Sequence, residues 1–180
     1  MIRTRVGYAG GTTQNPTYHN LGDHTETVQV DYDPALISYQ ELLDVFWAGH
    51  DPTRAAWSRQ YASIIFYHDE EQRRLAQASA ERYATECDCR VVTEIVPVTT
   101  FYLAEDYHQK YRLRQSSVLM DEFAARYPDP ADFVDSTAAA RVNGYLGGYG
   151  TLAALQAEID GLGLSPQAQE VLLDIVAQRR

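Results

Sequence analysis

The amino-acid sequence predicts an α/β protein, a two-layer α+β sandwich in which helices pack on a sheet. Residues 27–32 (TVQVDY) alternate between apolar and polar side chains, as a half-buried strand does. A helix with a clear start signal follows at Ser38. The segments then continue in the order strand, helix, strand, helix, strand, which is typical of helices that cover a sheet.

The first two strands flank a polar loop. Residues 2–8 form a short strand that leads into the glycine-rich turn of residues 7–11 (GYAGG). The loop then continues to Asp23. In the second strand, residues 27–32, the alternation places three apolar side chains on one face, which we expect to be the buried face: Val28, Val30 and Tyr32.

The helix signal is a capping box. Ser38 and Glu41 have the spacing at which each side chain binds the backbone of the other residue. Strand-like residues 61–67 and 91–96 then flank a long charged helix over residues 69–83. These elements complete the predicted sandwich.

The character of the chain changes after residue 115. We expect a domain over residues 1–115 and a C-terminal extension over residues 116–180. The extension contains a glycine-rich loop at residues 143–150 (NGYLGGYG) and two helices, at residues 151–160 and 165–178. The second helix opens with a serine cap and a proline at its first position. Both helices are amphipathic and are expected to pack on the core.

Composition excludes some partners. The formal net charge of -10 over 180 residues disfavours binding to nucleic acid or to an anionic membrane. The sequence has neither an apolar run of membrane-spanning length nor a signal peptide, so a cytoplasmic location is expected.

No common catalytic motif is present: there is no G-x-S-x-G, no HExxH and no phosphate loop. Polar residues instead gather near the ends of predicted strands. They are Tyr8, His24, Glu26, Tyr61 and residues 105–108 (EDYH).

These residues lie in ordered motifs that resemble peptide-methionine (S)-S-oxide reductases, the MsrA family. The motifs span residues 1 to about 115, and the resemblance implies the ferredoxin-like fold of that family. They include GYAGG (7–11), NPTY (15–18), HTE (24–26), RQY (59–61) and FYLAEDYHQKY (101–111).

The resemblance implies a site for sulfoxide reduction. In the family a cysteine thiolate attacks the sulfoxide sulfur, a carboxylic acid protonates the oxygen, and two tyrosine hydroxyls bind that oxygen. Glu26 resembles the acid, and Tyr8 and Tyr61 resemble the hydroxyls. Donors are needed where negative charge develops, and an apolar pocket would keep a carboxylic acid protonated near neutral pH.

Three further residues are weaker substrate-binding candidates. His24 is expected mainly to be a structural hydrogen-bond partner near Glu26. Glu105 and Asp106 are expected to shape the substrate region. No bound cofactor and no metal are implied.

The sequence departs from the family at the nucleophile. The Gly-Cys-Phe-Trp motif, which the family carries well before the tyrosine turn, is absent, so we expect the first strand and first helix to be missing. Either the start codon was assigned too late, or the protein is a nucleophile-free relative that binds oxidised methionine or another partner. As written, the polypeptide is expected to be inactive and to expose an unpaired sheet edge.

A second departure concerns the reductant. Leu146 stands where many relatives have a resolving cysteine in Gly-Tyr-Cys-Gly. Ala56 falls near a position where relatives have an aspartate. The intact protein would therefore be a monomeric, one-cysteine protein-repair enzyme that acts on free or protein-bound methionine sulfoxide under oxidative stress. An external thiol would reduce it: thioredoxin, glutaredoxin or glutathione in the cell, dithiothreitol in vitro.

The only cysteines are Cys87 and Cys89, between a helix end and a strand. Their neighbours Glu86 and Asp88 and the negative end of the helix disfavour the thiolate. We expect them to be incidental loop cysteines; a redox role and part of a metal site are the alternatives.

Overall fold

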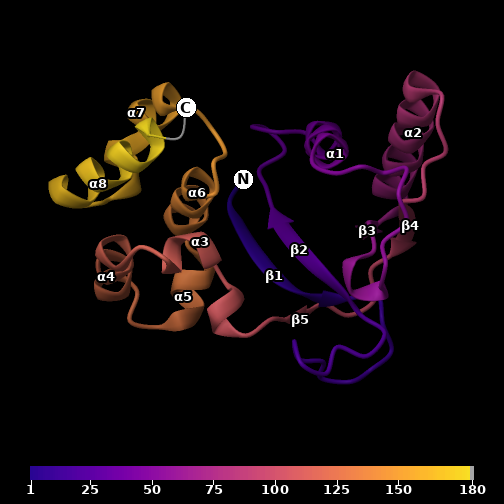
Figure 1. Ribbon diagram of the computed structural model, residues 1–180, viewed down its shortest axis with the longest axis horizontal. Coiled ribbons are helices and arrows are strands. Elements are labelled where there is room, and N and C mark those ends of the chain that lie inside the picture. The colour runs from indigo at the N-terminus through magenta and orange to yellow at the C-terminus, as the bar shows by residue number, and fades with distance from the viewer. Residues whose placement is uncertain (179–180) are drawn as a thin grey trace. The chain divides into compact units, whose positions relative to one another are not determined.

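The structure, a computed structural model, describes residues 1–178 and confirms the α/β class (Figure 1). The chain forms two compact units. One consists of Val6–Ala104, and the other joins Met1–Arg5 to Glu105–Arg180. The first contains the strands, except for the first residues of the N-terminal strand, and two long helices; the second is otherwise helical.

The larger sheet has three strands in the order β2-β1-β5 (Figure 1). They are β1 (Arg3–Ala9), β2 (Thr25–Asp31) and β5 (Tyr102–Leu103). β1 and β5 are antiparallel, with Gly7 opposite Leu103 and Tyr8 opposite Tyr102. The sheet therefore places the tyrosine of the glycine turn on the central strand.

A second sheet supports the two long helices. Its strands β3 (Ile64–Tyr67) and β4 (Glu94–Pro97) are parallel. Helices α1 (Tyr39–Ala48) and α2 (Glu70–Cys87) pack with it, and their shared core is Leu43, Trp47, Ile65 and Ala76. The buried Trp47 indole donates a hydrogen bond of 2.9 Å to the Ser79 hydroxyl, which joins α1 to α2.

The capping box at Ser38 and Glu41 is confirmed, with both reciprocal hydrogen bonds formed. α2 continues to Cys87, four residues beyond the predicted end, and its last residue is joined to Cys89 by a disulfide. The expectation of incidental loop cysteines was therefore wrong, since Cys87 is helical and paired with Cys89.

Two expectations about strands were also wrong. Val28 is 60% exposed, because it lies on the open face of β2, whereas the more buried residues lie on the opposite face, beginning with Thr25. Tyr61 does not begin a strand. It ends a short 3-10 helix, η1 (Arg59–Tyr61), because its backbone N–H donates to the Ser58 carbonyl.

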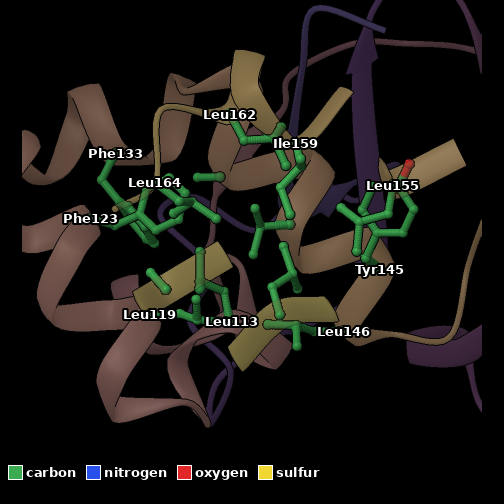
Figure 2. Close-up of a cluster of buried hydrophobic side chains, with 14 of the residues drawn as sticks. Leu113, Leu119, Phe123, Phe133, Tyr145, Leu146, Leu155, Ile159, Leu162 and Leu164 are labelled. Carbon is green, nitrogen blue, oxygen red and sulfur yellow. The ribbon is translucent and has the colours of Figure 1, made fainter. Parts of the chain in front are cut away.

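The helical unit contains six α-helices among the described residues. They pack around one core, in which Phe123 is 1% exposed and Leu155 and Leu172 are fully buried (Figure 2). The helices are α3 (Tyr111–Arg114), α4 (Ser117–Arg126), α5 (Pro130–Asp135), α6 (Thr137–Leu146), α7 (Leu152–Glu158) and α8 (Pro166–Ala177). Short 3-10 helices η2 (Asp106–His108) and η3 (Ile159–Leu162) complete it.

Part of the predicted glycine-rich loop is helical. Residues 143–146 form the last turn of α6, because Val142, Tyr145 and Leu146 are buried in the core and this packing outweighs the low helix propensity of Gly144. The serine and proline signals at Ser165 are confirmed at the start of α8.

Lys110 ties the first residues of the chain to the helical unit. It is 4% exposed, and its ammonium donates hydrogen bonds to the carbonyl oxygens of Thr4 and Val134. Burial lowers the pKa of Lys110 from its ordinary value to about 8. Within residues 1–178, no helix is both long and apolar enough to cross a bilayer.

Candidate active site

The loop before β2 is held by His24 and Asp23. The Gly11 N–H donates to His24 Nδ1 over 3.2 Å, and His24 Nε2 lies 2.8 Å from the Thr13 carbonyl oxygen. This pattern requires the neutral imidazole with its proton on Nε2. Because His24 is 1% exposed and both ring nitrogens bind backbone, its geometry is that of a structural residue.

Asp23 completes the loop. Its carboxylate accepts hydrogen bonds from the backbone and hydroxyl groups of Thr12 and Thr13. These hydrogen bonds hold the pKa of Asp23 far below its usual range. A Cβ on Gly11 would lie 2.6 Å from Asp23 Oδ1, so the glycine of the GYAGG motif allows this close approach.

The start of β2 is bound to η1. The Thr25 hydroxyl donates to the Arg59 carbonyl oxygen over 2.8 Å, and the Gln60 amide donates to Glu26 Oε1 over 2.7 Å. Arg59 in turn forms an ion pair of 2.5 Å with Glu94 on β4. Two segments more than 30 residues apart in sequence thus place Glu26 beside Tyr61.

Tyr61 has polar neighbours near its hydroxyl and an aromatic neighbour beside its ring. Loss of surrounding water raises the pKa of its hydroxyl, and the Glu26 carboxylate and a hydrogen bond with Tyr18 act in the same direction. The ring of Trp57 lies 5.1 Å from that of Tyr61, measured between centroids. Tyr61 is 43% exposed and Trp57 84% exposed, so this cluster faces solvent.

Glu26 is exposed, and the apolar surroundings expected for it are not formed by the described residues. The reason is its position on the open face of an edge strand, the face that also carries Val28. Its carboxylate is positioned by Gln60 rather than enclosed.

Tyr8 lies on β1, the strand next to β2. It is 2% exposed and packs in a small cluster with Leu21 and Ala104. Of the predicted acid and the two predicted hydroxyls, Glu26 and Tyr61 lie near enough to interact electrostatically, whereas Tyr8 is buried on the neighbouring strand.

Glu105 and Asp106 belong to the helical unit, where Glu105 precedes η2 and Asp106 is its first residue. Glu105 is half-buried and Asp106 is exposed. Their expected role at the substrate region stays a prediction.

Sequence reasoning missed three neighbours of the site: Tyr18, Trp57 and Gln60. Tyr18 and Gln60 lie inside the NPTY and RQY motifs, so the motifs contained the signal. Trp57 gave a weaker signal, as one of only two tryptophans in the chain, four residues before Tyr61.

Comparison with known proteins matches the sequence to one family along most of the chain. The profile of the family "Peptide methionine sulfoxide reductase" matches residues 1–137. The profile "Selenoprotein methionine sulfoxide reductase A, helical domain" matches residues 131–177.

Curated relatives agree. A peptide methionine sulfoxide reductase of Drosophila melanogaster is 44% identical over 175 residues, which cover 94% of this chain and 69% of that protein. Peptide methionine sulfoxide reductase A5 of Oryza sativa subsp. japonica is 43% identical over 151 residues, 81% of this chain and 59% of its own length. This chain thus spans about six to seven tenths of these relatives.

Solved structures give the same result. Methionine sulfoxide reductase A of Corynebacterium diphtheriae has a TM-score of 0.58 at 34% identity, covering 64% of each chain. Reduced Mxr1 of Saccharomyces cerevisiae has a TM-score of 0.58 at 30% identity, covering 63% of this chain and 70% of its own. The chain belongs to the peptide methionine sulfoxide reductase family.

Proposed function

We propose that this protein serves the reduction of methionine-(S)-sulfoxide, free or in proteins, to methionine. Glu26 is the proton donor to the sulfoxide oxygen, and the hydroxyls of Tyr61 and Tyr8 bind that oxygen. The observation that carries the proposal is the set of contacts that holds Glu26 and Tyr61 together: the Gln60 amide on Glu26, and the Thr25 hydroxyl on the Arg59 carbonyl.

The chemistry requires such a cluster. As a thiolate attacks the sulfur, negative charge grows on the oxygen, and hydrogen-bond donors aimed at that oxygen stabilise the transition state. The raised pKa of Tyr61 keeps its hydroxyl protonated, and thus a donor, throughout the neutral range. A proton from Glu26 then lets the oxygen pass from the methionine sulfur to the attacking cysteine sulfur, and methionine is released.

The thiolate must come from outside the residues described. The sequence contains no Gly-Cys-Phe-Trp motif, and its two cysteines form a disulfide with each other. In the proposed reaction the nucleophilic cysteine becomes a sulfenic acid as methionine is released, and two external thiol groups, such as those of thioredoxin, reduce it to the thiol with formation of a disulfide and release of water. The 180-residue chain alone is therefore expected not to turn over.

A second function is a binding module that recognises oxidised methionine without reducing it. The pairing of both cysteines favours it, because no free thiol is left to attack sulfur. The solvent-facing Trp57 beside Tyr61 offers an aromatic surface for the substrate methyl and thioether groups.

One experiment tests both functions. N-acetylmethionine-(S)-sulfoxide amide is titrated into the chain by calorimetry, with the (R) epimer as stereochemical control. We expect the (S) epimer to bind, and Glu26→Gln and Tyr61→Phe to weaken its binding. Tyr149→Phe, which removes the hydroxyl of a 77%-exposed tyrosine in the helical unit, is the matched control.

A parallel assay with dithiothreitol measures methionine formation. Binding without turnover fits both functions. Adding a Gly-Cys-Phe-Trp segment by fusion then separates them, since turnover after fusion supports the reductase and its continued absence supports the binding module. Equal binding of both epimers, or no effect of Glu26→Gln, would exclude the proposed site.

A further inference from the structure

The two cysteines occupy a specific helix-terminating turn. α2 ends at Cys87, and Asp88 follows in the left-handed conformation, with φ 48° and ψ 47°. The Cys89 N–H donates to the Ala84 carbonyl and the Asp88 N–H to the Thr85 carbonyl. This pair of hydrogen bonds is the Schellman motif, with Cys87 as the last helical residue and Cys89 two positions later.

The turn itself brings the cysteines to bonding distance. Their Cα atoms are 5.2 Å apart, inside the range of about 4.4–6.8 Å that disulfides require. The backbone hydrogen bonds do not involve either sulfur, so the turn is held independently of the disulfide.

The same turn accommodates the reduced state. Cys87 Sγ lies 3.7 Å from the Ala84 carbonyl oxygen, within reach of a thiol S–H donor. Breaking the disulfide therefore leaves Cys87 with an acceptor in place.

The disulfide is poorly suited to a structural role. A cross-link between residues separated by two positions closes a very short loop and restricts the unfolded chain little. Cys87 is exposed and Cys89 is half-buried, so an external thiol can reach the first sulfur. A disulfide that is exposed and contributes little to stability is of the kind that exchanges.

We propose that Cys87 and Cys89 form a redox-active dithiol–disulfide site that exchanges two electrons with thiols in solution. An external thiolate attacks the exposed Cys87 sulfur, forms a mixed disulfide, and releases the Cys89 sulfur, which takes up a proton. A second thiol attacks the external sulfur of the mixed disulfide. This attack releases the Cys87 thiol, and the two external thiol groups leave joined in a disulfide. Two thiols are oxidised to one disulfide as the protein disulfide becomes two thiols.

The site does not depend on the proposed function. It uses the only two cysteines in the sequence, so each thiol counted in a labelling experiment belongs to it. The co-reactant is a thiol of the glutathione or protein-dithiol class.

The test equilibrates the full chain in buffers of varied reduced-to-oxidised glutathione ratio. Samples are quenched with acid, labelled under denaturing conditions with a polyethylene-glycol maleimide, and read by gel shift. We expect a shift from zero to two labels as the ratio rises. The thermal midpoint of the reduced protein should stay within about 5 °C of that of the oxidised protein, since the closed loop is short.

Variants test the geometry. Cys89→Ser leaves one thiol at Cys87, which should form a mixed disulfide with oxidised glutathione in the native protein and release reduced glutathione. Cys87→Ser leaves the half-buried Cys89, which should do so more slowly. Asp88→Gly keeps the left-handed turn and should preserve exchange. Asp88→Val places a β-branched residue in that conformation and should shift the equilibrium toward the dithiol, with circular dichroism as the control for folding.

Two outcomes would overturn the proposal. One is a disulfide that resists millimolar dithiothreitol in the folded protein and is reduced only after denaturation. The other is a pair that stays reduced in fully oxidised glutathione. The two conditions are read on the same gel.

Discussion

The buried Lys110 makes the free energy of unfolding change with pH in the alkaline range. It is the only lysine in the sequence, and it is 4% exposed. Its pKa is lowered to about 8, chiefly because burial removes water from the ammonium; Asp135 opposes this shift, and Arg5 and Arg114 add to it. In the unfolded chain a lysine titrates near 10.4.

The sign follows from proton binding. Between pH 8 and pH 10 the folded protein has largely lost the Lys110 proton, while the unfolded chain still binds it. The unfolded state holds more protons, so the free energy of unfolding rises with pH in this window. With a folded pKa of about 8, the gain between pH 8 and pH 10 is about 2 kcal/mol.

Urea unfolding at pH 8, 9 and 10 measures the effect, with Lys110→Met as the comparison. The wild-type curve should rise by about 2 kcal/mol relative to the variant. Other groups contribute equally to both proteins, including Tyr39 and Tyr145, whose pKa values burial raises to about 12. Parallel curves for the two proteins would show that Lys110 is not buried as described, and the reasoning would fail.

Three further substitutions test local features. Ser38→Ala removes the capping box of α1 and should lower the free energy of unfolding by about 1 kcal/mol in urea titrations, whereas an unchanged midpoint would contradict the cap. Phe123→Ala empties the centre of the helical core and should cost about 3–5 kcal/mol, measured by calorimetry; a loss below about 1 kcal/mol would contradict its burial. Thr25→Val removes the hydrogen bond to the Arg59 carbonyl and should weaken (S)-sulfoxide binding in the calorimetric titration while preserving the circular dichroism spectrum; unchanged affinity would mean that η1 is placed by other contacts.

The sequence predicted those elements that depend on residues close to one another in the chain. The capping box at Ser38 and the serine-proline start of α8 depend on residues within one helical turn, and both were predicted. The alternation in residues 27–32 likewise located β2. Alternation could not say which face is buried, because the rest of the fold decides which face of β2 is covered, and it leaves Val28 exposed.

Glycine content misled the prediction of α6. Gly144 suggested a loop, yet the turn that contains it is helical because Tyr145 and Leu146 pack into a core with helices distant in sequence. The four helices between residues 111 and 146 were not predicted for the same reason. Their stability comes from tertiary packing rather than from local propensity.

The sequence by itself determined the family, through ordered motifs, and the residue types available for chemistry. The turn that joins Cys87 to Cys89 closes over a few adjacent residues, yet it was not predicted and became visible only in the structure. Only the tertiary structure decided that Gln60 binds Glu26, that Trp57 lies against Tyr61, and that Glu26 faces solvent. Such contacts depend on how segments far apart in the chain pack together, and packing is set by the whole core rather than by any local spacing.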